Sequence, residues 1–492
     1  MPRHHPTRPL PLAEVTGIDH ETDVLVIGFG GAGACAAIEA AEAAAEVIAL
    51  EGASGPGGST AQSGGEIYLG GGTPVQKACG FDDTAEDMHA FLTAALGPHV
   101  DEAKLRLYCD ESLAHYHWLV DHGVEFRHSL YDAPTWMPFT EDGLMWLGEN
   151  SHPFTEVARP APRGHRPPMP AFAGALLMER LTTSAEAAGV AIHTDTSALR
   201  LVVDGERVVG VVARHFTDEV VYRARRGVVL TTGGFVDDEE MLAEHAPHLL
   251  GHGKVSDGRD DGSGIRMGMA AGGAVRRMGT VQTALSIAPA LTCRGLIVNA
   301  HGQRFINEDT YPGLISEAGV HHQPAPIWIV VDEEGYEGVD ELDRMGLLPE
   351  AVDDDLAALE RAAGIPPGNL AATVATYNHH AEATGTDPHL HKAERWVRPL
   401  RGPLALINTR TGFAGAEGVP PSQSTGASGF TLGGLRTTID GAVLDVDGAP
   451  VPGLYAAGRA SHGIHGERYI SGTSIGDGTF FGRRAGRAVA RS

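Results

Sequence analysis

The first chemistry that the sequence suggests is the binding of a dinucleotide, through a glycine pattern between a strand and a helix. Gly28, Gly30 and Gly33 form a G-x-G-x-x-G pattern that follows a short apolar run and opens an alanine-rich stretch. In such a loop the first glycine makes the turn, the second lets a pyrophosphate approach the backbone, and the third allows close helix–strand packing. Glu51, after the next apolar run, is placed to accept the ribose hydroxyls. A plain glycine-rich turn is the alternative, and the elements around the pattern favour dinucleotide binding.

These residues need a strand–helix–strand unit to position them. The run 23–27 is apolar up to the first glycine of the pattern, which is typical of a buried parallel strand. A helix is expected from about 31 to 46 and a second strand over 47–51, and together they have about the usual length of a β-α-β motif. Residues 1–20 are expected to be a flexible N-terminal tail.

Composition excludes several classes of protein. The 492 residues include 63 acidic and 37 basic side chains, a net charge of −26, which argues against a nucleic-acid binder and a polybasic membrane anchor. No apolar stretch approaches the roughly 20 residues of a membrane span, and residues 1–20 lack the apolar core of a signal peptide. The four cysteines form no C-x-x-C pair, so a reducing compartment, the cytoplasm, is expected.

Further motifs identify the dinucleotide as FAD. Gly57-Gly58-Ser59-Thr60 follows the acid at the end of the second strand, and Gly453-Leu454-Tyr455-Ala456-Ala457-Gly458 lies near the C-terminus. From residue 23 to about 487, the chain resembles the fumarate reductase/succinate dehydrogenase flavoprotein superfamily. The resemblance is also carried, in the family's order, by Thr231-Thr232-Gly233-Gly234-Phe235, Asp261-Gly262-Ser263-Gly264-Ile265, Gly302-Gln303-Arg304-Phe305-Ile306-Asn307-Glu308, Thr431-Leu432-Gly433-Gly434-Leu435 and the block from His465 to Arg483.

The resemblance implies an α/β fold with two domains. A Rossmann-like FAD domain of the glutathione-reductase type would comprise 21–284 and 405–492, and an inserted α+β catalytic or capping domain would span 285–404. The resemblance also implies hydride exchange between flavin N5, in FAD that we assume to be non-covalently bound, and a carbon of a C–C or C=C bond. The implied cofactor residues are Gly28, Gly30, Gly31, Ala32, Gly33, Glu51, Gly52, Gly58, Ser59, Thr60, Ser63, Gly64, Gly65, Gly233, Asp261, Gly458, Ser474 and Ile475.

Two of these residues open the last helix, expected near 474–490. In the family, the backbone N–H groups at the positions of Ser474 and Ile475 face the N1–C2=O edge of the flavin. Because a helix N-terminus carries about half a positive charge, it would stabilise the anionic reduced flavin.

The substrate positions depart from those of the family's fumarate reductases. Those enzymes typically read F-V-N-E-x-x-x-R, and Pro312 stands here where the arginine would fall. In the closing block, Tyr469 stands at a carboxylate-binding arginine and Ser471 replaces a glycine, while Gly429-Phe430 replaces a histidine pair. Arginine–carboxylate pairs are bidentate and cationic, so a site that has lost this clamp is unsuited to a dicarboxylate.

The groups that remain suit a neutral, mostly apolar ketone. Tyr311 and the Tyr469-x-Ser471 pair are similar to those of the 3-ketosteroid Δ4-(5α)-dehydrogenases, which implies that Tyr311, Tyr469 and Ser471 are catalytic. Ser471 would handle the C4 proton, relayed through a tyrosine, and the C5 hydrogen would leave as hydride. Serine alone is a weak base, so a coupled network and hydroxyl donors to the ketone are needed. The predicted substrate contacts are Phe430 and Gly472.

Three alternatives stay open at this point. One is a 3-ketosteroid Δ1-dehydrogenase, another is a reductase of an unsaturated acid such as fumarate or urocanate, and the third is a non-redox role of the FAD. The residues also leave open the steroid and its side chain, 5α against 5β stereochemistry, which tyrosine relays the proton, the electron acceptor and the oligomeric state.

Other candidate residues are interpreted as structural. His321-His322 and His379-His380 lack the i, i+4 spacing with a carboxylate that a metal site would need, so no metal is predicted. His465 is interpreted as a structural or cofactor-edge residue, and Arg468 as a surface or supporting arginine. The aromatic stretch 131–148 fits either plain core or a wall of an apolar pocket. No G-x-S-x-G elbow is evident, which argues against a hydrolase.

Overall fold

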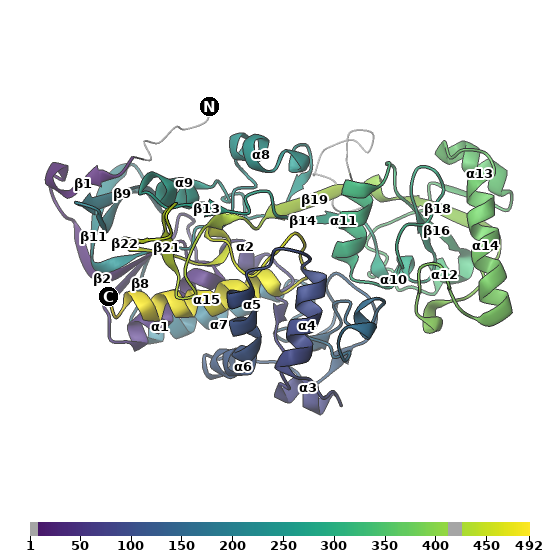
Figure 1. The fold of residues 1–492 in the computed structure, drawn as a ribbon, viewed down its shortest axis with the longest axis horizontal. Coiled ribbons are helices and arrows are strands. Elements are labelled where there is room, and N and C mark those ends of the chain that lie inside the picture. The colour runs from purple at the N-terminus through teal and green to yellow at the C-terminus, as the bar shows by residue number, and fades with distance from the viewer. Residues whose placement is uncertain (1–7, 412–425) are drawn as a thin grey trace.

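A nine-stranded sheet forms one half of the molecule (Figure 1). The computed structural model describes residues 8–411 and 426–492. The strand order is β1-β9-β10-β11-β2-β3-β8, and β22 pairs with both β11 and β21. The strands are β1 (Leu10–Pro11), β2 (His20–Ile27), β3 (Val47–Leu50), β8 (Ala191–His193), β9 (Thr196–Asp204), β10 (Arg207–His215), β11 (Asp218–Leu230), β21 (Ala442–Leu444) and β22 (Pro450–Ala456).

The parallel centre of this sheet contains the predicted β-α-β unit. β2 pairs in parallel with β3 on one side and with β11 on the other. The intervening helix, α1, spans Gly31–Glu42. The apolar residues of β2 and β3 are buried, because both faces of a parallel sheet are covered. The predicted α/β fold with a Rossmann-like β-α-β unit is confirmed.

Helices α7 (Gly174–Ala187) and α15 (Thr473–Val489) pack against α1. A Cβ atom on Gly482 would lie 2.4 Å from the Ala32 carbonyl oxygen, and one on Gly486 would lie 2.1 Å from that of Ala36. Any side chain at these two positions would clash with the α1 backbone. The glycines therefore let the backbones of α1 and α15 touch.

A second, antiparallel sheet forms the other half of the molecule (Figure 1). Its order is β15-β16-β18-β17, with bounds Leu296–Val298, Trp328–Asp332, Leu404–Asn408 and Ala351–Asp353. The helices around it are α10 (Pro289–Thr292), α11 (Pro312–His322), α12 (Glu333–Glu337), α13 (Leu356–Ala363) and α14 (Asn369–Thr384). Two antiparallel partners, β14 (Val281–Leu285) and β19 (Ala427–Thr431), run between the two halves.

A helical region and a small sheet lie beside α15. The elements are α3 (Pro74–Ala78), α4 (Ala85–Ala95), α5 (Glu102–Asp110) and α6 (Ser112–Asp121), and the strands β4 (Ile67–Tyr68), β5 (Leu130–Tyr131), β6 (Leu144–Met145) and β7 (Gly164–His165). Between α4 and α5 the chain turns at Gly97, which adopts a positive φ of 74°, and Asp101 caps the new helix.

Short elements complete the described chain. They are α2 (Gly58–Ala61), α8 (Glu239–His245), α9 (Ser263–Ala270), β12 (Gly253–Lys254), β13 (Val275–Arg276) and β20 (Gly434–Leu435), with six 3-10 turns, of which η6 spans Gly458–Ala460. Of the predicted flexible tail, residues 1–7 lie outside the described residues, and Leu10–Pro11 pairs with β9 at the sheet edge. Leu12 and Val15 pack on the same sheet.

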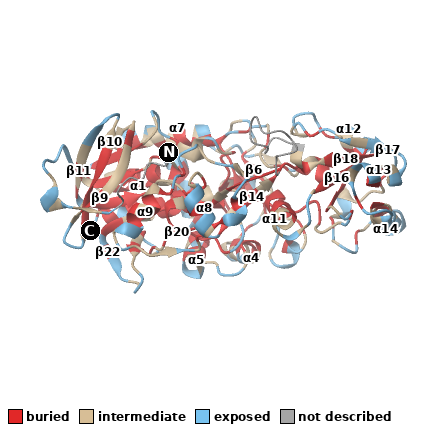
Figure 2. Cartoon of the chain, turned by 90° about the horizontal axis from the view of Figure 1, so that it is seen from above, coloured by how far each residue is buried: buried red, intermediate tan, exposed pale blue. Residues whose placement is uncertain are grey.

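Burial follows this architecture. Buried residues run along the centre of the molecule through both sheets, and exposed residues lie at the periphery (Figure 2). Among the described residues, no helix combines the length and the apolar character needed to cross a membrane.

Candidate active site

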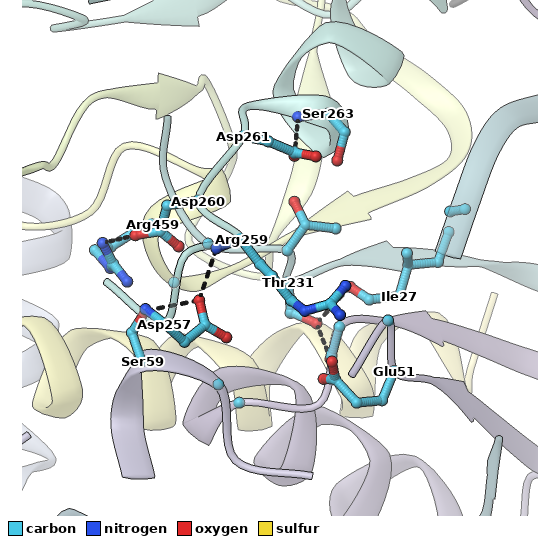
Figure 3. Close-up of a pocket in the computed structure, with 18 of the residues that line it drawn as sticks. Ile27, Glu51, Ser59, Thr231, Asp257, Arg259, Asp260, Asp261, Ser263 and Arg459 are labelled. Carbon is cyan, nitrogen blue, oxygen red and sulfur yellow. Dashed lines mark hydrogen bonds and ion pairs between the residues drawn. The ribbon is translucent and has the colours of Figure 1, made fainter. Parts of the chain in front are cut away.

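A cavity of about 1240 Å³ opens at the carboxyl ends of β2, β3 and β11. Open α/β sheets bind their ligands at this edge. Several segments that lie far apart in the sequence line the cavity: the glycine loop, residues 58–60, residues 257–261 and residues 458–459. Figure 3 shows how Glu51, Ser59, Asp257 and Arg459 converge on it.

Different structural constraints require glycine at the three positions of the G-x-G-x-x-G pattern. Gly28 adopts a φ of +95°, and a Cβ there would lie 2.6 Å from the Thr231 carbonyl oxygen. A Cβ on Gly33 would lie 2.0 Å from the carbonyl oxygen of Gly28. The chain's own packing thus requires both. A Cβ on Gly30, by contrast, would meet no protein atom closer than 3.7 Å, although Gly30 lines the cavity. The fit of a ligand, such as a pyrophosphate, explains glycine at this position.

The carboxylate of Glu51 is buried and fixed at the cavity wall. Its Oε2 accepts a hydrogen bond from the Phe29 N–H at 2.9 Å, and its Oε1 accepts one from the Ala53 N–H at 2.8 Å. Each carboxylate oxygen has a further acceptor position. Glu51 can therefore accept ribose hydroxyls as the sequence predicts.

Two helices begin at this cavity. Gly31 and Ala32 at the start of α1, and Ser474 and Ile475 at the start of α15, all line it. The free N–H groups and the dipoles of helix N-termini favour anionic groups. The cavity therefore fits a dinucleotide that carries a negatively charged pyrophosphate.

Most of the predicted cofactor residues line the cavity. They are Gly28, Gly30, Gly31, Ala32, Glu51, Gly52, Gly58, Ser59, Thr60, Gly233, Asp261, Gly458, Ser474 and Ile475.

The other four predicted residues have structural surroundings of their own. Gly33 packs on the first turn, as described above, and the Ser63 hydroxyl donates to the Thr60 carbonyl at 2.7 Å. A Cβ on Gly64 would lie 2.4 Å from Glu66 Oε1, and one on Gly65 would lie 2.5 Å from the backbone nitrogen of Gly174. Their role at the cofactor stays a prediction.

The sequence reasoning missed an ion pair at the cavity. Arg459 pairs with the buried carboxylate of Asp260, and both residues line the cavity. A Cβ on Gly233 would lie 2.2 Å from Asp260 Oδ1, so this glycine makes room for the carboxylate. Arg459 directly follows Gly458, and Asp260 directly precedes Asp261. Their position next to recognised motif residues was the available signal.

The predicted proton relay is assembled by two distant segments. The hydroxyls of Tyr311, just before α11, and Ser471, just before α15, form a hydrogen bond of 2.9 Å. Tyr311 is buried, and two glycines make room for it. A Cβ on Gly313 would lie 2.2 Å from Tyr311 Cε1, and one on Gly148 would lie 2.9 Å from Tyr311 Cβ. The position of this phenol is therefore fixed by its neighbours.

Tyr469 lies in an aromatic setting near this pair. Phe430 meets it edge-on with ring centroids 5.3 Å apart, and His465 stacks on it at 5.7 Å. Tyr469, Ser471 and Phe430 are each only partly buried. Gly472, with a φ of +79°, turns the chain into α15 directly after Ser471.

The two phenols and the imidazole at this end of the site are neutral at pH 7. Burial raises the pKa of Tyr311 and of Tyr469 above the usual tyrosine value, so both phenols keep their protons. Burial lowers the pKa of His465 to about 3, so its ring is uncharged. The Glu66 carboxylate adds to the rise in the pKa of Tyr469, and the Arg459 guanidinium opposes it.

Arg468 does not join this group. Its side chain is 44% exposed and forms an ion pair with Glu317 at 3.3 Å. The location agrees with the interpretation as a surface or supporting arginine.

The aromatic stretch 131–148 contacts the relay. The Trp136 ring meets Tyr311 edge-on at 6.2 Å, and its Nε1–H donates to the Ile287 carbonyl at 3.0 Å. Trp136 packs against two of the core clusters and contacts Tyr311, so a role of this stretch as a wall of the substrate pocket stays a prediction. In the described ranges, no group of three or more histidine, cysteine or acidic side chains is arranged to hold a metal ion.

Comparisons with known proteins agree with this geometry. Residues 23–475 match the family described as FAD binding domain. The chain is similar to the crystal structure of a 3-ketosteroid-Δ4-(5α)-dehydrogenase from Rhodococcus jostii in complex with 4-androstene-3,17-dione, with 44% identity, a TM-score of 0.93, and 99% and 100% of the two chains covered.

Two more distant relatives show the range of the family. A 3-oxo-5-alpha-steroid 4-dehydrogenase from Comamonas testosteroni is 27% identical, with 89% of this chain and 92% of that protein covered. A probable fumarate reductase from Shewanella frigidimarina is 26% identical, with 97% of this chain and 76% of that protein covered.

Proposed function

Because this chain belongs to the family of proteins with an FAD binding domain, we propose that it is an FAD-dependent dehydrogenase that introduces a C4–C5 double bond into 3-ketosteroids. It is an oxidoreductase of the 3-oxo-5α-steroid 4-dehydrogenase type. The Rhodococcus enzyme, which it resembles over the whole chain, was crystallised with a 4-ene-3-one steroid. A small, apolar ketone of this class is the proposed substrate.

The hydrogen bond between Tyr311 and Ser471 is the observation that carries this proposal. Its length of 2.9 Å supports a relay in which Ser471 accepts the C4 proton while Tyr311 accepts the proton of Ser471. In the same step Tyr311 would release its own hydroxyl proton to water, so that one proton passes from C4 to solvent and both hydroxyls end the step neutral. With Tyr311 occupied in this way, Tyr469 is left to donate a hydrogen bond to the C3 ketone.

Polarisation of the ketone makes the C4 hydrogen acidic enough to remove. A hydroxyl aimed at the carbonyl oxygen stabilises the negative charge that develops there as C4 loses its proton. Tyr469 can act as this donor because its raised pKa keeps it protonated. Phe430 and Gly472 are the proposed apolar contacts of the steroid, since Phe430 packs on the Tyr469 ring.

The cofactor cavity supplies the acceptor for the second hydrogen. Gly30, Gly31 and the N-terminus of α1 would hold the pyrophosphate, Glu51 the ribose, and Ser474 and Ile475 the flavin edge. When bound, FAD accepts the C5 hydrogen as a hydride at N5.

The site does not favour a dicarboxylate reductase. Pro312 begins α11 where the family's reductases have an arginine, and Arg468 is bound to Glu317 at the surface. Two phenols and an uncharged imidazole surround Ser471, and the nearby Arg459 is already paired with Asp260, so two carboxylates would lack partners. Charged groups buried without partners are strongly unfavourable.

An anaerobic mixing experiment tests the proposal. The purified flavoprotein is mixed with a saturated 5α-3-ketosteroid while the flavin absorbance is followed. We expect bleaching with a 4-ene-3-one product, and a strong loss of rate in Tyr311→Phe. Tyr336→Phe, whose hydroxyl donates to Leu347 in the other sheet region, is the matched control. A 1-ene product would indicate a Δ1-dehydrogenase. Reoxidation of the dithionite-reduced protein by fumarate or urocanate, without bleaching by the ketone, would contradict a dehydrogenase.

Three further features complete the proposal. An FAD domain of 21–284 and 405–492 with an inserted domain of 285–404 agrees with two sheets in separate halves (Figure 1). The four cysteines are unpaired, which supports the reducing environment of the cytoplasm. A separate electron acceptor must reoxidise the flavin after each turnover.

A further inference from the structure

Arg459 lies between the cofactor cavity and the proposed ketone donor. Its side chain is 14% exposed and lines the cavity. Its guanidinium carbon lies 5.2 Å from the centroid of the Phe430 ring, and this ring meets Tyr469 edge-on. Arg459 therefore touches the cofactor space on one side and the aromatic pair of the substrate site on the other.

A buried carboxylate fixes this guanidinium. Asp260 is buried and ion-paired with Arg459 Nη1 (Figure 3). The backbone of Asp260 is held in turn, because its N–H donates to Asp237 Oδ2 at 3.0 Å. Gly233 provides the space for the carboxylate, as described above. An ion pair this well buried holds its partners in one geometry, since either charge alone would be costly to bury.

Two charges of opposite sign act on the Tyr469 hydroxyl. Glu66, just before β4, disfavours negative charge on the phenol oxygen, and Arg459 favours it. Glu66 is itself buried and lies 3.5 Å from Arg166, with its Oε1 otherwise without a hydrogen-bond partner. The uncharged His465 ring and the protonated Tyr311 also face Tyr469. The backbone N–H groups of Gly472 and Ser474 act in the same direction as Arg459, because hydrogen bonds from them lower the pKa of the phenol.

We propose that Arg459, held by Asp260, is a positioning residue that strengthens the hydrogen bond from Tyr469 to the substrate ketone. The inference rests on the proposed function, because it needs a ketone opposite Tyr469. A cation near a phenol stabilises partial negative charge on its oxygen, so the hydroxyl donates more strongly. Glu66 acts in the opposite direction on the same hydroxyl.

Infrared difference spectroscopy of a bound 4-ene-3-one measures the strength of this hydrogen bond through the frequency of the C3 carbonyl stretch. The C3 carbonyl stretch moves to lower frequency as the donor strengthens, and its measurement in the oxidised holoenzyme needs no turnover. We expect Arg459→Met to raise the frequency of the C3 carbonyl stretch, as Tyr469→Phe should also do. Glu66→Gln should lower this frequency. Arg459→Lys, which keeps the positive charge, should have a frequency close to that of the wild type.

The rate of flavin reduction by the saturated ketone provides the second measurement. We expect Arg459→Met to slow it on the order of tenfold, because the charge that develops on the ketone oxygen loses part of its stabilisation. Arg266→Met is the matched control for the carbonyl stretch. Arg266 lines the same cavity and is held by Asp238 at 2.7 Å, but it is not among the charges that act on Tyr469.

The outcomes separate this inference from the proposed function. A carbonyl stretch that moves in Tyr469→Phe but stays fixed in Arg459→Met and Arg459→Lys would overturn the role of Arg459 alone. Shifts of the same sign in Arg459→Met and Glu66→Gln would overturn it too, because opposite charges must have opposite effects. If Arg459→Met loses its FAD, Arg459→Lys and Glu66→Gln still decide the question. A wild-type protein that binds no 4-ene-3-one, and whose flavin no 3-ketosteroid reduces, would refute the proposed function instead.

Discussion

The proposed cofactor end and the proposed substrate end of the site differ in whether backbone or side chains form them. Backbone dominates the cofactor end, where a glycine loop and the first turns of α1 and α15 surround the cavity. Side chains dominate the substrate end, where Tyr311, Phe430, Tyr469 and Ser471 come from three distant segments. The first arrangement suits a large anionic cofactor, and the second suits a neutral ring system with one polar group.

This difference determines how each end responds to substitution. At the cofactor end, a side chain added at a glycine should weaken folding where it would overlap the backbone, and should weaken cofactor binding where it would overlap the ligand. At the substrate end the loss of one hydroxyl removes chemistry and leaves the fold intact. The predictions below test this contrast, from the largest expected effect to the smallest.

Replacement of Gly33 should eliminate the cofactor. In Gly33→Val, the new side chain would overlap the Gly28 carbonyl oxygen, which lies 2.0 Å from a Cβ at this position. We expect no flavin to copurify, as measured by the ratio of flavin to protein absorbance. Gly55→Ala is the control, because a Cβ there meets no atom within 4 Å. Normal flavin content in Gly33→Val would mean that the loop is not formed as described.

Replacement of Ser471 should remove the reaction and keep the cofactor. Ser471→Ala breaks the 2.9 Å hydrogen bond to Tyr311 and leaves the C4 proton without an acceptor. We expect flavin reduction by a 3-ketosteroid to slow by about 10²–10⁴-fold, the usual contribution of a positioned acid or base. Stopped-flow absorbance gives the rate, and the visible spectrum gives the flavin content. A rate within threefold of wild type would exclude Ser471 from the relay.

A methyl group at Gly30 should weaken FAD binding without harming the apoprotein. Its Cβ would have only ordinary contacts at 3.7 Å with protein atoms. The added methyl group should therefore disturb the bound cofactor and not the folding of the protein. We expect Gly30→Ala to raise the FAD dissociation constant by about 10- to 100-fold, from a steric cost of about 1–3 kcal/mol. Calorimetric titration of the apoprotein with FAD measures this dissociation constant. A large fall in the melting temperature of the apoprotein would instead show that glycine serves packing here.

Two buried, neutral histidines should make stability depend on pH: His465, which stacks on Tyr469, and His462, whose ring is hydrogen-bonded to the His465 carbonyl at 2.9 Å. Burial lowers the pKa of His462 and His465 to about 3, against about 6.5 in an unfolded chain. Between pH 6.5 and 3 the unfolded chain therefore binds protons that the folded chain does not, so these groups reduce stability as the pH falls. Each contributes a slope of up to about 1.4 kcal/mol per pH unit. In urea titrations between pH 7.5 and 5.5, His465→Gln should show a shallower decline than wild type; an equal decline would contradict a neutral buried His465.

The sequence predicted the cofactor end well because its determinants are local. The glycine pattern, the apolar run before it and Glu51 lie within 30 residues, so their spacing alone implies a strand, a turn and a helix. The different reasons for Gly28, Gly30 and Gly33 needed the structure, since only coordinates show what a Cβ would meet.

The substrate end was predicted through family resemblance and not through spacing. Tyr311 and Ser471 are 160 residues apart, and nothing local in either segment indicates that their hydroxyls meet. Arg459 and Asp260 each adjoin a recognised motif residue, which marks the two positions as candidates. Their pairing was missed because they are 199 residues apart and neither motif indicates the other as its partner.

The glycine contact between α1 and α15 has a thermal consequence. Gly482 and Gly486 bring the two helices to backbone distance, and both helices begin at the cofactor cavity. If the pyrophosphate binds at α1 and the flavin edge at α15, as proposed, both would be held by one closely packed helix pair. Release of the cofactor and melting of this helix pair should then occur as a single calorimetric event, whose midpoint rises with the concentration of free FAD.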